Sequence, residues 1–203
     1  EGKMSSRTGK VVTFEFLLGE VENLVKEKMK DRGFSEKENA DIMQKIAIGA
    51  LKYSILKQSI GSDIIYDFEK SISFEGDSGP YLQYAYARAQ SVLEKAKREK
   101  ISPAIRIIQI THPNDPNIKV NDLERMMIYF PEVVEKAGKE YEPHIVVLYL
   151  TELAREFNNY YANNKIVDKN DAFSPYKVAL TKAFLVIMKN GLWLLGMHHL
   201  ERM

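Results

Sequence analysis

Proline positions constrain this chain more firmly than any other sequence feature. Pro80, Pro131, Pro143 and Pro175 each stand at the start of a run whose apolar residues recur with helical spacing. Proline is favoured in the first turn of a helix, where its missing N–H costs nothing. The other prolines fall together within residues 101–118, and a stretch so interrupted cannot be one continuous helix. The sequence therefore predicts helices on both sides of a linker.

Capping residues and apolar periodicity set the expected helix bounds. We expect helices over residues 13–30, from the Ser35/Glu38 capping box to the break at Gly61, and over residues 80–97, 122–129, 131–140, 143–163 and from the Ser174 cap to Gly191. Residues 63–67 are expected to form a short strand or an extended segment. No internal repeat is present, so the fold class is mainly α, with a helical bundle and an N-terminal appendage.

Composition excludes several classes of protein. The chain has 203 residues, a formal net charge of +1 and a 45% apolar fraction, which is ordinary for a globular protein and too apolar for a disordered one. Cysteine is absent, which removes disulfide scaffolds, thiol nucleophiles and cysteine-ligated metals. No apolar run approaches the roughly 18 residues needed to span a bilayer, and no signal peptide is evident. We therefore expect a cytoplasmic protein without a membrane partner.

The usual catalytic patterns are missing. His112, His144, His198 and His199 are the histidines, and none has a second ligand at metal-binding spacing. There is no nucleophile elbow, P-loop or dinucleotide fingerprint, and no pair of carboxylates is marked by its spacing as an acid and a base. We expect no metal site, and the chain taken alone does not have the features of a complete enzyme.

The N-terminal string is chemically distinctive. Residues 3–10 combine cations, hydroxyls and a flexible glycine. Such a loop suits a polyphosphate, because lysines supply point charges while hydroxyls and backbone N–H groups donate to phosphate oxygens. The alternative is a solvated terminus, since short basic segments are common.

Two motifs carry a resemblance to a known family. Lys3-Met4-Ser5-Ser6-Arg7 resembles the K-M-S-K-S loop of class I aminoacyl-tRNA synthetases, in the form common among arginyl enzymes. Residues 74–88, F-E-G-D-S-G-P-Y-L-Q-Y-A-Y-A-R, are similar to the arginyl-tRNA synthetase string F-E-G-N-T-G-P-Y-L-Q-Y-A-h-A-R, with Asp77 and Ser78 as departures. The second motif is long and specific.

The resemblance continues along most of the chain. Further similar segments are residues 142–144, 150–161, 177–183, 191–197 and 201–203. It implies two regions: residues 1–76, a remnant of the catalytic domain with the K-M-S-type loop and stem-contact helices, and residues 77–203, a DALR-type helical anticodon-binding domain. The family's His-Ile-Gly-His element and Rossmann core have no counterpart here. We therefore expect the C-terminal part of an arginyl-tRNA synthetase that is inactive by itself.

The resemblance also implies partners and roles. The full-length enzyme joins arginine to its tRNA with ATP and Mg²⁺, and Lys3, Met4, Ser5, Ser6 and Arg7 would close over the ATP phosphates as pyrophosphate leaves. No cofactor is expected on the fragment. The helical region would contact the anticodon arm of arginine tRNA, whose loop bases stack on aromatic rings and are read at their edges.

The candidate tRNA-contacting residues share an aromatic face, an amide or a positive charge. They are Tyr81, Tyr84, Arg88, Asn158, Asn159, Tyr161, Lys177, Trp193 and Met197. Packing is the competing interpretation for the aromatic residues and the methionine, above all for Trp193, because single tryptophans are usually well buried. Lys177 stands where the family has arginine, which places a bidentate contact there in doubt.

Two other identities stay open on the sequence. One is a non-catalytic helical interaction module with a protein partner, which the near-neutral charge favours and the K-M-S-type loop opposes. The other is a cysteinyl or glycyl β synthetase with a similar helical domain. A fragment of this kind would also self-associate through surface that a catalytic core normally covers.

Overall fold

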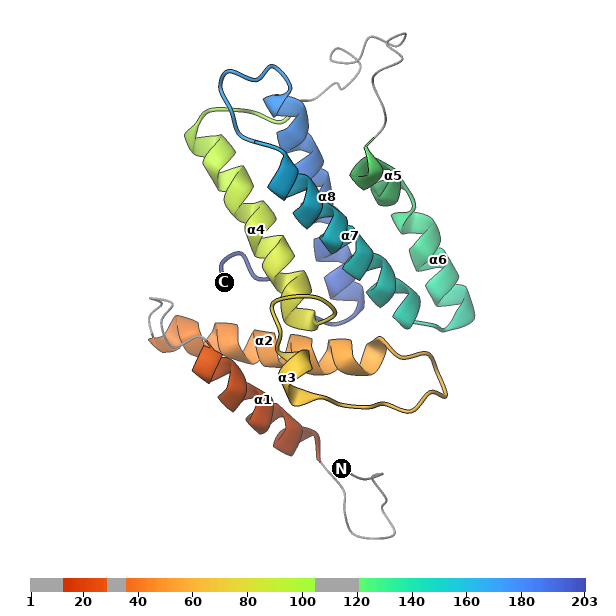
Figure 1. The fold of residues 1–203 in the computed structure, drawn as a ribbon. Coiled ribbons are helices and arrows are strands. Elements are labelled where there is room, and N and C mark those ends of the chain that lie inside the picture. Colours follow the sequence, from red (N-terminus) through yellow and green to blue (C-terminus); the bar gives the residue numbers. More distant parts are fainter. Residues whose placement is uncertain (1–12, 29–35, 105–120) are drawn as a thin grey trace.

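Every regular element in the described part of the molecule is an α-helix. The structure is a computed structural model that describes residues 13–28, 36–104 and 121–203 (Figure 1). Its helices are α1 (Phe14–Lys28), α2 (Glu36–Leu56), α3 (Phe68–Ser71), α4 (Gly79–Arg98), α5 (Asp122–Ile128), α6 (Phe130–Glu140), α7 (His144–Asn163) and α8 (Ser174–Leu194). The predicted mainly α class is confirmed. Residues 63–67 have no regular secondary structure, so the expected strand is not formed. No described helix is long and apolar enough to cross a membrane.

Side chains cap the starts of α4 and α5. Ser78 caps α4 by accepting a hydrogen bond from the Tyr81 N–H at 3.1 Å, and Pro80 occupies the first turn. Asn121 and Glu124 form a reciprocal capping box at the start of α5. Both arrangements satisfy backbone donors that the first turn of a helix leaves without partners. Ser35, another of the predicted caps, lies outside the described residues.

The last helix begins and ends differently from the prediction. Gly191, the predicted end of this helix, lies inside α8. A Cβ there would come within 2.5 Å of Leu150 Cδ2, so the glycine permits close packing of α8 against α7. The helix ends at Leu194, and Gly196 just beyond it has a φ of +66°, the left-handed conformation typical of a glycine that follows a helix. Ser174 lies within the first turn of α8 rather than capping it.

The buried apolar residues form two cores. The larger core lies mainly among α4–α8, takes in Tyr53 of α2, and includes the stacked rings of Phe157 and Phe184, whose centroids are 4.0 Å apart. The smaller core lies between α1 and α2 and includes Ile72 and Leu200. In Figure 1, α4, α7 and α8 lie side by side, while α1 and α2 lie across their lower ends. Each fully buried large side chain contributes roughly 1.5–3 kcal/mol of transfer free energy.

Candidate nucleic-acid interface

The predicted phosphate-binding loop cannot be placed. Lys3, Met4, Ser5, Ser6 and Arg7 lie outside the described residues. The described candidates are all on α4, α7, α8 and the segment that follows α8.

Five of the predicted residues meet between α4 and α7. We call them the α4–α7 cluster: Tyr81, Tyr84, Arg88, Asn158 and Tyr161. The α4 members recur at helical spacing and so share one side of that helix. The two α7 members are separated by three residues and so lie on one side of α7. The sequence motifs alone do not show that these two helix faces meet.

Arg88 is the centre of this cluster. Its Nη1 donates to Asn158 Oδ1 at 2.5 Å, and its Nη2 donates to the Tyr84 hydroxyl at 3.2 Å. Its guanidinium carbon lies 4.7 Å from the centroid of the Tyr84 ring and 5.2 Å from that of Tyr161. A guanidinium held over aromatic faces is attracted to their π electrons. The cation is therefore oriented by neutral groups.

No carboxylate forms an ion pair with Arg88 among the described residues. The side chain is half-buried, so its charge is partly removed from water. Because its hydrogen-bond partners are an amide and a phenol, its charge is not neutralised within the fold. A guanidinium in this state is a suitable partner for a phosphate or for the acceptor edge of a base.

Burial separates supporting members of the cluster from exposed ones. Tyr81 is only 8% exposed, and its hydroxyl accepts a hydrogen bond from Asn158 Nδ2 at 3.0 Å. Asn158 thus uses both ends of its amide, one on Tyr81 and one on Arg88. Tyr161 is 42% exposed, so its ring offers surface to a ligand. We infer that Tyr81 and Asn158 position Arg88, while Tyr84, Arg88 and Tyr161 face outward.

Sequence reasoning missed two neighbours of this cluster. Phe74 meets the Tyr84 ring edge to face, with centroids 6.5 Å apart. Arg155, three residues before Asn158 on α7, forms ion pairs with Asp77 and Glu152. These contacts hold the 73–78 loop against α4 and α7. The only hint in the sequence was the helical spacing between Arg155 and Asn158.

The remaining predicted residues lie elsewhere or have other partners. Asn159 is exposed and accepts a hydrogen bond from Asn163 Nδ2 at 2.8 Å. Trp193 is 76% exposed, so it is not a core residue. Met197 is 3% exposed and belongs to the larger core. Met197 therefore has almost no surface to present to a ligand.

Lys177 belongs to a second polar group, at the opposite end of the bundle. We call this group the loop clasp: Glu99, Lys165, Asp168, Lys169, Asp171, Ser174 and Lys177. Every lysine in it is paired with a carboxylate. The pairs are Lys165–Asp168 at 2.8 Å, Lys169–Glu99 at 2.6 Å and Lys177–Asp171 at 2.8 Å.

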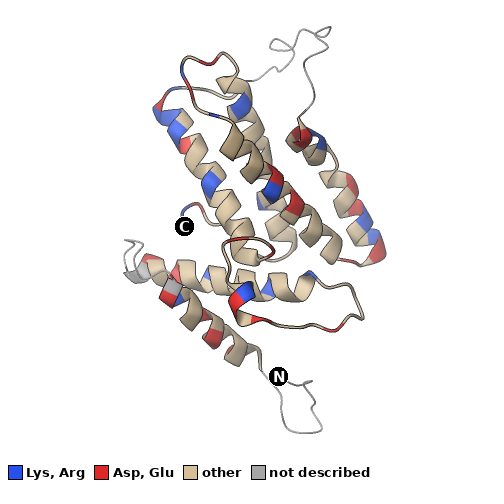
Figure 2. Ribbon diagram, in the orientation of Figure 1, with Lys and Arg blue, Asp and Glu red and all other residues tan. Residues whose placement is uncertain are grey.

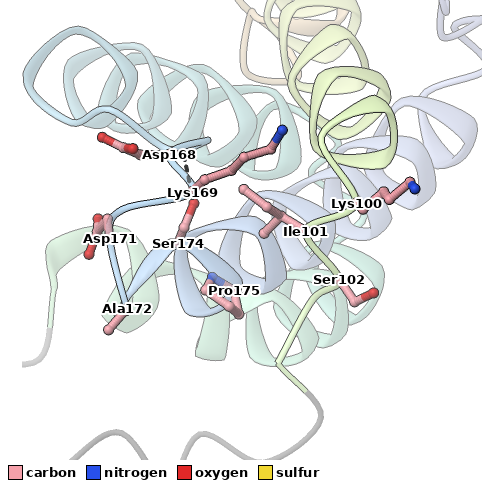
Figure 3. Close-up of a pocket in the computed structure, with 9 residues that line it drawn as sticks. All are labelled: Lys100, Ile101, Ser102, Asp168, Lys169, Asp171, Ala172, Ser174 and Pro175. Carbon is pink, nitrogen blue, oxygen red and sulfur yellow. Dashed lines mark hydrogen bonds between the residues drawn. The ribbon is translucent and has the colours of Figure 1, made fainter.

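Ser174 fixes the centre of the loop clasp. Its buried hydroxyl donates to the Ile166 carbonyl at 2.6 Å and accepts from the Asp168 N–H at 2.9 Å. Figure 3 shows Ser174 and Asp168 on one side of a pocket that Lys100 and Ile101 close on the other. The serine thus ties the loop to the start of α8.

The carboxylates of the clasp are held in their charged form. A hydrogen bond from Lys177, assisted by the Phe173 N–H, lowers the pKa of Asp171 below its ordinary value of 3.8. A hydrogen bond from Lys165 and another from the Asn170 N–H lower the pKa of Asp168 in the same direction. The clasp is therefore an ionic closure of the 164–174 loop.

The described residues offer no obvious metal centre and no extended basic face. No group of three or more His, Cys, Asp or Glu side chains converges within the described ranges. Figure 2 shows basic and acidic residues mixed along α6 and α7. Nucleic-acid binding here would depend on a local group such as the α4–α7 cluster rather than on a broad positive surface.

The sequence matches a known family and named relatives. The family described as the DALR anticodon binding domain matches residues 82–203. The chain is 31% identical to the arginine–tRNA ligase of Pyrococcus furiosus over 208 aligned positions, and 34% identical to that of Ignicoccus hospitalis over 203. These alignments cover 100% and 99% of this chain but only 33% and 31% of those proteins. The chain therefore spans about a third of the length of such relatives.

Solved structures give the same correspondence. The chain superposes on Thermus thermophilus arginyl-tRNA synthetase with a TM-score of 0.81 at 25% identity, covering 100% of this chain and 34% of that one. It also superposes on the Plasmodium falciparum arginyl-tRNA synthetase with a TM-score of 0.76 at 21% identity, covering 95% and 34%. The second match shows shared fold alone.

Proposed function

Because the chain belongs to the DALR anticodon binding domain family, we propose that its α4–α7 face binds the anticodon arm of a tRNA. We propose further that the chain is the C-terminal part of an arginine–tRNA ligase. The relatives that match along its whole length carry that name.

The observation that supports this proposal is the state of Arg88. The guanidinium is oriented by Asn158 and Tyr84 and lies against the rings of Tyr84 and Tyr161. Because no described carboxylate neutralises it, its charge remains available to an anionic ligand. A flat cation beside partly exposed rings combines the two contacts that an unpaired nucleotide needs, a stacking face and a donor.

The chemistry at this face would be recognition without bond making. Bases in an anticodon loop are free to leave the stack, so one base would lie against Tyr161 or Tyr84. Arg88 would then donate to a base edge or to a phosphate of the same loop. Tyr81 and Asn158 would hold the guanidinium in place during this contact. Each stacked base would contribute about 1–3 kcal/mol.

For the whole protein we propose the reaction of the relatives. Arginine would be activated with ATP and Mg²⁺ and then transferred to its tRNA. Lys3, Met4, Ser5, Ser6 and Arg7 would bind the ATP phosphates through charge and hydrogen bonds. Residues 1–76 would belong to the catalytic region and residues 77–203 to the anticodon-binding region, and this chain alone would form no adenylate. A cytoplasmic location follows from the same proposal.

The isolated chain is also proposed to self-associate. Large apolar side chains are exposed on α1 and on the segment after α2: Phe14, Phe16, Ile60, Ile64 and Ile65. A catalytic core would cover such residues in a longer protein, and a second copy would cover them here. Sedimentation velocity at rising concentration tests this directly, and a concentration-independent monomer would contradict it.

Binding to arginine tRNA tests the main proposal. Fluorescence anisotropy would compare an arginine tRNA transcript with the same transcript carrying a changed middle anticodon base, each at two salt concentrations. We expect tighter binding of the unaltered transcript at both. Equal, salt-sensitive binding of both transcripts would mean that the face contacts phosphates without reading the anticodon. Absence of binding to either transcript would favour a protein partner instead.

A further inference from the structure

The segment after α8 connects the two cores. We call residues 195–203 the tail. Leu195 and Met197 are buried in the larger core. Leu200 is buried in the smaller core, and Met203 packs against that core. Within nine residues the chain therefore passes from one core to the other.

Gln83 joins the tail to both helices at this crossing. Its side chain is 0% exposed. Its Nε2 donates to the Lys45 carbonyl of α2 at 3.0 Å and to the His198 carbonyl of the tail at 2.8 Å. Carbonyl oxygens only accept, so the amide nitrogen must be the atom that faces them. The amide nitrogen therefore links α2, α4 and the tail, while the buried Oε1 has no hydrogen-bond partner among the described residues.

The helices meet here too closely for larger residues. A Cβ on Gly79 would come within 2.1 Å of the Gly49 carbonyl oxygen. A Cβ on Gly49 would come within 2.9 Å of Gln83 Oε1. The α2 and α4 backbones are thus in contact, and Gln83 fills the space beside that contact.

Two further contacts hold the tail in place. Lys52 Nζ of α2 donates to the Gly196 carbonyl at 2.5 Å. The His199 ring lies against Tyr86 of α4, with centroids 4.9 Å apart. The tail is therefore bound to α2 and to α4 independently of its apolar residues.

Gln83 and Tyr84 are consecutive residues that face different regions. Tyr84 contacts Arg88 in the α4–α7 cluster, whereas Gln83 contacts α2 and the tail. A displacement of α4 at the cluster would therefore also move Gln83 against α2 and the tail, because close-packed interiors transmit strain.

We propose that Gln83 is a positioning residue that holds α2 and the tail against α4, so that the two cores unfold and refold together. It follows that a ligand at the α4–α7 cluster also stabilises α1 and α2. This second statement rests on the proposed function, whereas the first concerns the free chain alone.

Hydrogen exchange on the free chain tests the fastening. Gln83→Leu removes both donors and replaces the amide with an apolar side chain of similar size. Gln90→Leu on the same helix is the matched control. We expect amides of α1 and α2 to exchange at least tenfold faster in Gln83→Leu, while those of α7 and α8 change by less than about threefold. Equal acceleration in both cores, or none, would overturn the proposal.

Lys52→Met provides a milder second variant, should Gln83→Leu not fold. It removes only the donor to the Gly196 carbonyl. We expect amides of α1 and α2 to exchange about threefold faster, a smaller change than in Gln83→Leu, and those of α7 to change little. Acceleration confined to α7 and α8 would contradict the fastening.

Adding an arginine-tRNA anticodon-arm hairpin separates the two statements. In the unaltered chain we expect slower exchange in α4, α7, α1 and α2. In Gln83→Leu we expect the slowing to remain in α4 and α7 and to disappear from α1 and α2. Undiminished slowing of α1 and α2 would overturn the coupling. A hairpin that fails to bind either protein would refute the proposed function and leave the free-chain result standing.

Discussion

The α4–α7 cluster and the loop clasp contain similar residue types but pair their cations differently. Each brings cations, amides or hydroxyls together from segments distant in sequence. In the clasp, Lys165, Lys169 and Lys177 are each paired with a carboxylate. In the cluster, Arg88 is held by an amide, a phenol and aromatic rings. One group neutralises its charge within the fold, and the other does not.

This difference decides what a cation can do. An ion pair satisfies a lysine, and a phosphate would have to displace the carboxylate before binding it. A guanidinium oriented by neutral groups needs no such exchange. The partner of a basic residue, and not its identity, thus separates a recognition surface from a structural closure. We therefore propose that Arg88 takes part in recognition and that Lys177 belongs to the closure.

Arg88→Ala is expected to produce the largest effect. Charge-assisted hydrogen bonds contribute roughly 1.5–3 kcal/mol, so binding of an arginine tRNA should weaken about 100-fold. Arg88→Lys keeps the charge without the planar fork and should recover only part of the loss. Anisotropy titrations measure both, with thermal unfolding as the control for folding. An Arg88→Ala protein that binds normally would place recognition elsewhere.

Ser174→Ala should destabilise the fold and spare binding. The substitution leaves the Ile166 carbonyl and the Asp168 N–H without their partner. Losing these bonds in a buried position should lower the free energy of unfolding by about 2 kcal/mol. Urea denaturation measures that loss, and the affinity for tRNA should stay within about twofold. A large loss of affinity with unchanged stability would reverse the roles of the two regions.

Tyr161 provides a comparison within the cluster. Tyr161→Ala should weaken tRNA binding about tenfold, because a stacking face is lost. Tyr161→Phe keeps the ring and should change affinity by less than about twofold. If the phenylalanine variant loses as much as the alanine variant, then the hydroxyl and not the ring makes the contact.

Much of the fold was predictable because its determinants are local. Prolines, caps and apolar spacing identified the helices of the bundle, since these features act within one or two turns. The end of α8 was missed for a tertiary reason. In the sequence, Gly191 has the appearance of a residue that ends a helix. In the structure it lies within α8, where Leu150 of α7 leaves no room for a Cβ.

The sequence named five residues that the structure brings together in the α4–α7 cluster, but it did not predict their arrangement. The motifs supplied Tyr84, Arg88 and Asn158, yet sequence spacing does not show which faces of α4 and α7 meet. The pairing of Lys177 with Asp171 was equally hidden, although only six residues separate them, because a loop conformation determines it. The exposure of Trp193 contradicted the expectation of burial, since residue type alone does not fix the side of a helix that packs.

The acid sensitivity of the loop clasp is the smallest expected effect. Because Lys177 holds the pKa of Asp171 below 3.8, this carboxylate stabilises the fold above that pH, and the stabilisation is lost as the pH falls through the lowered value. The pair is partly exposed, so Asp171→Asn should cost only roughly 0.5 kcal/mol at pH 7. Urea denaturation should show that difference at pH 7, and the difference should shrink as the pH falls below 3.8 and Asp171 takes up a proton. A difference that persists at low pH would show that Asp171 acts through hydrogen-bond geometry rather than charge. Affinity for tRNA at pH 7 should be the same for both proteins, because the cluster contains no partner of Asp171.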